Sequence, residues 1–280
     1  MTQQDTAGLS GAGLDRVIRM EAINNFRDFG GMPTMDGGRV RTGRLFRSAH
    51  HARASAADQA RLAALGVRTV VDLRRPAERA LQPSAWRGVL PIAVLEEADA
   101  PGEGGASHDA PHVAAFAAGE FSPAAAARFL ARRYGEFPYE PRHVRLFARA
   151  FAALAQGGPA DEGGLLIHCA AGKDRTGLLV WLTHHLLGVH PDDAMADYLL
   201  SNDAADLANR VPAAKQTLER AHGRTIPDEA VLALYSVSPD YIVRSIAAIT
   251  ARSGSLDAYL VDVLGVLPCR REAARARLLA

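Results

Sequence analysis

The sequence predicts an α/β fold in which a central, mostly parallel sheet is flanked by helices. Two short apolar runs, 67–73 and 164–168, have the composition and length of strands that are buried on both faces. Longer segments around them repeat their apolar residues with the period of an amphipathic helix, as in sheets whose strands are joined by helical crossovers. With 280 residues, 48% of them hydrophobic, the chain can build one large domain.

The start of the chain differs in character from the rest. Residues 1–11 are polar, and residues 1–20 are predicted to form a flexible leader, followed by a single domain at 21–280. The domain opens with an aromatic and charged cluster at 25–31 that ends in two glycines. Because phenylalanines flank Arg27 and Asp28, we interpret these two residues as a buried structural pair that supports a functional site.

Capping residues and prolines mark the remaining elements. Ser55 and Ser122 are suited to be helix N-caps, and Gly66 and Gly188 follow expected helix ends. Several helices are expected to begin at a proline, which is favoured in the first turn. The sequence thus predicts a strand pair, or a strand and a turn, at 40–48 and a further strand at 89–94. It predicts helices at 55–65, 122–134, 141–156, 178–187, 191–200, 203–222, 227–237, 239–252 and 255–264.

Two connecting segments stand out by composition. Residues 98–112 are rich in Gly, Ala, Pro and Asp and are predicted to form a mobile loop. Residues 74–79 form a charged loop, with Glu78 among several arginines, directly after the strand at 67–73. This loop either borders a pocket or is a solvated turn with local ion pairs, and the sequence leaves both readings open.

The strand at 164–168 leads into the loop on which the functional prediction depends. The string HCAAGKDRTG at 168–177 follows the strand and precedes an apolar helix. Small residues at Ala170, Ala171 and Gly172 let the backbone close around a ligand of phosphate size. A strand, a compact loop and a helix start together collect backbone N–H groups into an anion cradle.

Three side chains give this cradle its chemistry. A helix N-terminus, inward amides and a nearby guanidinium lower the pKa of a cysteine, so Cys169 is expected to be a thiolate nucleophile. Arg175, six residues later, can offer a bidentate fork to two phosphate oxygens. Thr176 is placed to donate its hydroxyl to the Cys169 sulfur. This Cys-x5-Arg-Thr pattern is typical of cysteine-dependent phosphatases.

Two other interpretations of the loop fit its residues less well. A lone buried cysteine most often serves as a small hydrophobe, but here it has a histidine before it and a glycine, an arginine and a threonine in register. A Walker phosphate loop is excluded because Asp174 follows Lys173 and no glycine lies five residues before Gly172.

The string at 168–177 resembles the signature of a bacterial family of tyrosine and phosphoinositide phosphatases typified by mycobacterial protein tyrosine phosphatase B. The Lys173–Asp174 pair separates this branch from ordinary tyrosine phosphatases. Weaker matches make the resemblance extend from about residue 20 to the end of the chain; they lie at 25–31, 43–48, 69–74 and 254–260.

The resemblance implies a tyrosine-phosphatase-like fold with a helical lid, which we place within 203–237. It implies hydrolysis of phosphate monoesters through a phosphocysteine intermediate, with no cofactor and no metal. Phosphotyrosyl proteins are the implied substrates, with phosphoinositides as a further class. The expected phosphate-binding residues, besides Arg175, are His168, Ala170, Ala171, Gly172, Lys173 and Gly177.

The general acid has two candidates. Ordinary tyrosine phosphatases carry it on a Trp-Pro-Asp loop, and this tripeptide does not occur here. The resemblance implies Asp174, although its cationic neighbours favour its ionised form and so suit a base better than an acid. Asp72 is the second candidate, because it lies near the carboxyl end of a predicted parallel strand, where ligand-binding residues gather.

Lysine usage gives the one hint about substrate class. The chain has only two lysines, Lys173 and Lys215, among many arginines, so a lysine inside the signature loop is unlikely to be incidental. Its compact ammonium can contact a second anionic group, which predicts activity on phosphoinositides beside phosphotyrosine.

Composition limits the remaining classes. A net charge of +1 gives no indication of a nucleic-acid partner, and two cysteines a hundred positions apart do not suggest a disulfide framework. His50 and His51 have no ligand-type residue at metal spacing. No run suits a signal peptide or a transmembrane helix, so we expect a cytoplasmic protein, with signal-less export left open. The alternatives to a phosphatase are a non-catalytic phosphate-binding module and an arsenate reductase or sulfurtransferase using the same loop.

Overall fold

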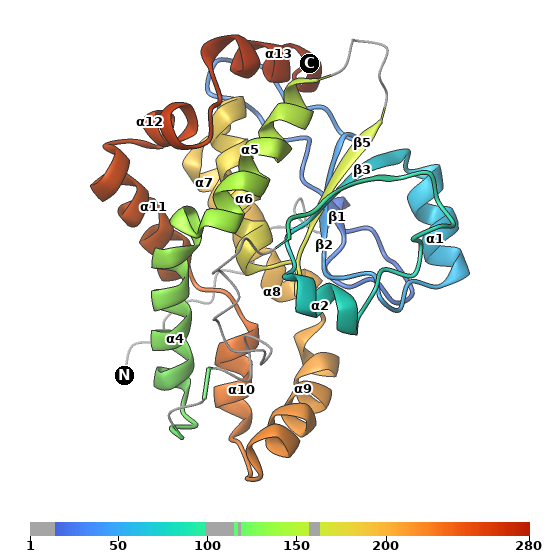
Figure 1. Ribbon diagram of the computed structural model, residues 1–280, viewed down its shortest axis with the longest axis vertical. Coiled ribbons are helices and arrows are strands. Elements are labelled where there is room, and N and C mark those ends of the chain that lie inside the picture. Colours follow the sequence, from blue (N-terminus) through green and yellow to red (C-terminus); the bar gives the residue numbers. More distant parts are fainter. Residues whose placement is uncertain (1–14, 99–114, 117–118, 157–162) are drawn as a thin grey trace.

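The protein was analysed as a computed structural model that describes residues 15–98, 115–116, 119–156 and 163–280 (Figure 1). Its centre is a five-stranded sheet of order β1-β2-β5-β3-β4. All neighbouring strands are parallel except the β1–β2 pair, which confirms the predicted mostly parallel sheet. The strands are β1 (Arg27–Asp28), β2 (Leu45–Ser48), β3 (Val67–Asp72), β4 (Ala93–Leu95) and β5 (Gly164–His168).

Side chains of the central strands alternate between two apolar layers. In β5, Leu165 and Ile167 join one core cluster and Leu166 joins the other, because successive strand residues point to opposite faces. The larger cluster is covered by α5 (Pro141–Ala155) and α6 (Asp174–Leu187), and the smaller one by α1 (Ala56–Ala64) (Figure 1). Burial on both faces explains why β5 is an uninterrupted apolar run.

The other helices complete the two sides of the domain and extend beyond the sheet. In Figure 1, α4, α9 and α10 form an arm that projects past the carboxyl ends of the strands. These helices and the shorter ones are α2 (Pro76–Leu81), α4 (Pro123–Glu136), η2 (Phe137–Tyr139), α7 (Pro191–Leu199), α8 (Ser201–Ala204), α9 (Leu207–His222), α10 (Asp228–Tyr235), α11 (Pro239–Ser253), α12 (Leu256–Ala258), η3 (Tyr259–Val263) and α13 (Pro268–Leu278).

Strand register sets the location of the site. Ser48 on β2 and Asp72 on β3 are both aligned with His168, the last residue of β5. The carboxyl ends of three parallel strands therefore meet at one edge of the sheet, which is where α/β folds place their ligands.

Several predicted boundaries were wrong. The strand expected at 89–94 begins only at Ala93, because Val89 and Leu90 are held in a turn by the Trp86 carbonyl. The helix expected at 203–222 is interrupted at Asp206, whose φ is +50°, and the one expected at 255–264 is a short α-helix followed by a π-helix. Helix α13 was not predicted, because its sequence is rich in arginine and only Ala274 and Leu278 are buried.

Two predicted segments, the leader at 1–20 and the loop at 98–112, lie largely outside the described residues. The described end of the leader is attached to the domain: Arg16 contacts Asp197 at 2.9 Å, and Val17 forms a β-bridge with Arg27. Among the described helices, none is both long and apolar enough to cross a membrane.

Candidate active site

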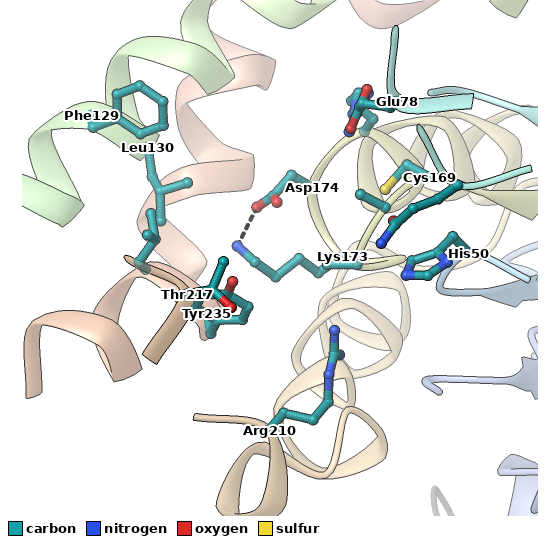
Figure 2. Close-up of a pocket in the computed structure, with 15 residues that line it drawn as sticks. His50, Glu78, Phe129, Leu130, Cys169, Lys173, Asp174, Arg210, Thr217 and Tyr235 are labelled. Atoms are coloured by element: carbon teal, nitrogen blue, oxygen red, sulfur yellow. Dashed lines mark hydrogen bonds and ion pairs between the residues drawn. The ribbon is translucent and has the colours of Figure 1, made fainter. Parts of the chain in front are cut away.

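A cavity of about 280 Å³ lies where β5 ends and α6 begins (Figure 2). The loop between these elements supplies Cys169, Ala170, Ala171 and Lys173 to its lining, and the first turn of α6 supplies Asp174 and Arg175. The surrounding walls come from α2, α4, α9, α10 and the segment after β2, through Glu78, Gln82, Phe129, Leu130, Arg210, Thr217, Leu234, Tyr235 and His50. The loop that the sequence predicts to bind phosphate thus forms part of the cavity wall.

The backbone of the loop is held from behind by its carbonyl groups. The side-chain amide of Asn25 donates to the carbonyls of Ala171 and Gly172, at 3.2 and 3.0 Å. Arg47 also donates to the Gly172 carbonyl at 3.0 Å, and the backbone N–H of His50 donates to the carbonyl of residue 170 at 3.1 Å. Because the N–H and C=O groups of a peptide unit point in opposite directions, these bonds orient the loop amides toward an anion on the other side.

The residues behind the loop form a buried ionic cluster around Asp197. Its carboxylate contacts Arg47 at 2.8 Å, Arg27 at 3.4 Å and Arg16 at 2.9 Å. Burial raises the pKa of Asp197, but the charges of Arg27 and Arg47 outweigh this and hold it well below its usual range. The ion cluster fixes Arg47, and through it one carbonyl of the loop.

The predicted pairing of Arg27 with Asp28 is wrong. Arg27 is fully buried and binds Asn25 and Asp197, so it supports the loop indirectly, whereas Asp28 accepts hydrogen bonds from the backbone of Gly30 and Gly43. Adjacent residues on a strand point to opposite faces, which keeps these two side chains apart.

The Cys169 sulfur accepts a hydrogen bond from the backbone N–H of Gly172, at 3.3 Å. The hydrogen bond expected from Thr176 is not formed; its hydroxyl is fully buried in the first turn of α6 without a partner among the described residues. His168, expected to bind phosphate, is also buried, and its Nδ1 contacts the Cys169 carbonyl at 3.2 Å. His168 therefore positions the loop backbone and does not line the cavity.

The guanidinium of Arg175 is already oriented by a carboxylate. Its two terminal nitrogens contact the Glu78 carboxylate at 2.7 and 2.8 Å, and one of them also donates to the Leu73 carbonyl at 3.0 Å. Burial raises the pKa of Glu78, but the charge of Arg175 and its hydrogen bonds outweigh this and lower it to about 2. Of the segment 74–79, which was predicted to be a charged loop, residues 76–79 begin α2, and Glu78 alone lines the cavity. Arg74 and Arg75, for which the sequence left a place at the pocket or in a solvated turn open, do not line it.

The two candidate acids occupy different surroundings. Asp174 lines the cavity, where its Oδ1 accepts from Lys173 at 2.7 Å and from the Tyr134 hydroxyl at 2.9 Å. Asp72 is buried outside the lining and forms two hydrogen bonds with the Arg74 guanidinium, at 2.9 and 2.7 Å. Burial raises the pKa of Asp72, but His168 and Arg74 hold it well below its usual range. This geometry does not support Asp72 as the acid.

Several residues in and around the cavity were not predicted from the sequence; Tyr134 contacts a lining residue but does not itself line the cavity. Tyr134 reaches Asp174 from α4, and its own pKa is raised well above the usual value by burial and by that carboxylate, so it remains a donor. Phe129, Leu130 and Leu234 form an apolar wall, and Arg210 reaches the cavity from α9. Gly177, in contrast, packs against the Tyr198 ring, where a Cβ would lie 2.9 Å from it, and does not line the cavity. No group of His, Cys, Asp and Glu side chains in the described residues could hold a metal ion.

Residues 18–280 match the sequence model of a protein family that is described as the tyrosine phosphatase family. The chain belongs to this family.

Two curated relatives are similar to this tyrosine phosphatase over most of its length. A Cupriavidus necator protein, provisionally named a tyrosine-protein phosphatase, is 38% identical over 257 residues, which cover 89% of the chain and 84% of the relative. The triple specificity protein phosphatase PtpB of Mycobacterium tuberculosis is 31% identical over 262 residues, covering 85% and 90%. A Pseudomonas aeruginosa TpbA variant, solved with phosphotyrosine, aligns at 18% identity and a TM-score of 0.30, covering 71% of this phosphatase and 89% of TpbA.

Gly172 provides a test of the loop geometry. Its φ is +70°, and a Cβ there would lie 2.2 Å from the Ser48 carbonyl oxygen. We expect Gly172→Ala to lower the free energy of unfolding, measured by urea denaturation, by at least about 2 kcal/mol more than Gly37→Ala. Gly37 is the matched control, since its φ is +90° but nothing lies within 4 Å of the added Cβ. Equal losses in the two variants would contradict the close approach.

The Arg175–Glu78 ion pair predicts a pH dependence of stability. The pKa of Glu78 is lowered from 4.5 to about 2 on folding, so its contribution is complete above pH 4.5 and is lost as the pH falls toward 2. At pH 7 we expect Glu78→Gln to lower the free energy of unfolding by about 2 kcal/mol, and this difference to shrink below pH 4.5. Glu136→Gln is the control, because Glu136 forms an exposed pair with Arg133 and should cost less than about 0.5 kcal/mol. A difference for Glu78→Gln that does not change with pH would argue against the charge interaction.

Proposed function

We propose that this phosphatase hydrolyses phosphotyrosine in proteins through a phosphocysteine intermediate. The observation that carries the proposal is the common cavity of Cys169 and Arg175, over a loop whose carbonyls are bound from behind. Such a site can hold three phosphate oxygens with backbone N–H groups and one guanidinium while a sulfur faces the phosphorus. The apolar wall of Phe129, Leu130 and Leu234 suits the ring of a tyrosine.

The reaction proceeds by two displacements at phosphorus. In the first, the Cys169 thiolate forms an S–P bond while the P–O bond to tyrosine breaks, and the departing oxygen takes a proton from Asp174. In the second, water forms a P–O bond while the S–P bond breaks, and Asp174 takes the proton of the water. Inorganic phosphate leaves, and both side chains return to their starting states.

Arg175 is presented for this role by Glu78. Both terminal nitrogens contact Glu78, which fixes the plane of the guanidinium. Its Nε–H and the second proton of one terminal nitrogen remain to bind two phosphate oxygens side by side. Because the ion pair already holds the Arg175 side chain in one rotamer, substrate binding does not have to order this side chain.

Asp174 is the acid that the geometry favours over Asp72. It lines the cavity beside Cys169, whereas both oxygens of Asp72 are occupied by Arg74 behind the strand ends. The Tyr134 hydroxyl donates to the same Asp174 oxygen that Lys173 binds, which leaves the other oxygen for the proton transfer.

The alternative functions have less support. A phosphate-binding module without turnover needs neither a nucleophile nor an oriented arginine, and both are present. Arsenate reduction needs a resolving thiol near the first, and Cys269 is an exposed residue at the start of α13 that does not line the cavity. Both cysteines are free thiols, and we propose a cytoplasmic location, where reducing conditions preserve them.

Phosphate release without added metal tests the function. We expect turnover of a phosphotyrosyl peptide in the presence of a chelator, no turnover by Cys169→Ser, and less activity on a phosphoseryl peptide. A phosphoinositide panel in the same assay tests the lipid activity predicted from Lys173. Turnover that survives in Cys169→Ser would contradict the phosphocysteine mechanism.

Leaving-group dependence tests the assignment of the acid. Because phenolate needs a proton and dinitrophenolate does not, we expect Asp174→Asn to lose about 100-fold in kcat on phenyl phosphate and little on dinitrophenyl phosphate. Asp72→Asn is the comparison, and its loss should be the same on both substrates. A loss confined to phenyl phosphate in Asp72→Asn would transfer the role to Asp72.

A further inference from the structure

Three cationic side chains of the described residues line the cavity, and two of them are matched. Lys173 contacts Asp174 at 2.7 Å, and Arg175 binds both oxygens of Glu78. Arg210, on α9, lines the same cavity, and its guanidinium makes no ion pair or side-chain hydrogen bond within the described part of the chain. Within the described residues, the cavity therefore has one positive charge without an ion-pair partner.

The described residues around Arg210 do not supply its guanidinium with a hydrogen-bond or ion-pair partner. Its side chain is half-buried and extends from α9 toward the loop (Figure 2). Burial lowers the pKa of Arg210, an effect that Tyr235 and Asp206 only partly offset. The Asp206 carboxylate is bound by the Asn209 amide at 2.9 and 3.0 Å. A guanidinium that loses water without gaining a partner is unfavourable, and an incoming anion reverses that cost.

His50 faces the same space as Arg210. Its Nδ1 accepts from the backbone N–H of Ala52 at 3.3 Å, so the neutral ring carries its proton on Nε2. Burial lowers the pKa of His50 to about 4, and the charge of Arg210 is one of the contributors after Arg74 and His168. Two donors, one charged and one neutral, are thus available to an anion apart from the phosphate loop.

We propose that Arg210, with His50, forms a second anion subsite that takes the carboxylate of an acidic residue next to the phosphotyrosine. This inference rests on the proposed function. A guanidinium fork matches a carboxylate with two parallel hydrogen bonds. If the tyrosine ring packs against the apolar wall on α4 and α10, the remaining wall of the cavity on α9, which carries Arg210 and Thr217, is available to a neighbouring residue of the peptide.

A peptide fits the surroundings better than a lipid headgroup. A headgroup would bring an anionic bilayer against the arm of α4, α9 and α10. The tip of this arm, at the α9–α10 connection, has no net positive charge to attract such a surface, because basic and acidic side chains balance there: Lys215, Arg220 and Arg224 against Glu219, Asp228 and Glu229.

The experiment compares kcat/KM on phosphotyrosyl peptides that differ only in the flanking residue, Glu, Gln or Lys. We expect the wild-type phosphatase to prefer Glu over Gln by about five- to tenfold. Arg210→Gln should bring this ratio close to one, and Arg210→Glu should shift the preference to Lys. Arg220→Gln is the control on the same helix, since the Arg220 side chain bonds to its own helix at the Gln216 carbonyl, and it should keep the wild-type ratio.

The outcomes separate the inference from the function. If the wild-type phosphatase hydrolyses 4-nitrophenyl phosphate and all peptides without preference, the subsite is disproved and the phosphatase proposal stands. If no substrate is hydrolysed, the proposed function itself fails. If Arg210→Gln keeps the peptide ratio but lowers turnover of a phosphoinositide in vesicles, the arginine serves a lipid substrate and the peptide inference is overturned. Reversal in Arg210→Glu is an effect that a merely structural residue would not produce.

Discussion

The site depends on how the carbonyl groups of the signature loop are held. A loop of seven residues around an anion must turn its N–H groups inward, and this forces its carbonyls toward the protein interior, where each needs a donor. Asn25, Arg47 and the backbone of residue 50 provide these donors. Asn25 adopts a φ of +56°, an unusual conformation for a residue other than glycine. The strain is maintained because the same residue binds two loop carbonyls and Arg27.

Charge matching follows from the same requirement. A cavity built to receive a phosphate dianion needs cations, but cations that are buried in an empty site repel one another and lose water. In this phosphatase the buried arginines share carboxylates: Asp197 serves the residues behind the loop, and Glu78 serves Arg175. These pairs keep the guanidinium groups fixed before any substrate binds. The cation without an ion-pair partner among the described residues is Arg210. It lies on α9, on a different wall of the cavity from the loop that carries Cys169.

The sequence was most informative where the residues of the site lie close together along the chain. Cys169, Lys173, Asp174 and Arg175 lie within seven positions, and their order next to an apolar strand predicted both the loop and its place at the sheet edge. The α/β class followed from β3 and β5, because strands buried on both faces are continuous apolar runs.

The partners of these residues could not be predicted in the same way. Glu78 precedes Arg175 by 97 residues, and Asp197 follows Arg47 by 150, so no local pattern connects them. Tyr134 reads as one more apolar position of an amphipathic helix, and only packing brings its hydroxyl to Asp174. Thr176 illustrates the opposite error: proximity in sequence suggested a bond to the sulfur, but the hydroxyl is buried in the first turn of α6 without a hydrogen-bond partner among the described residues.

The ion cluster around Asp197 also has a consequence for the order of events during synthesis. Its carboxylate comes from α7, after the loop, while its arginines come from the first strands, so the cluster cannot form until the ribosome has released the chain beyond α7. Contacts of such long sequence separation form late in folding. Until then Arg47 lacks the carboxylate that fixes it, so one of the donors to the Gly172 carbonyl is not yet held in place.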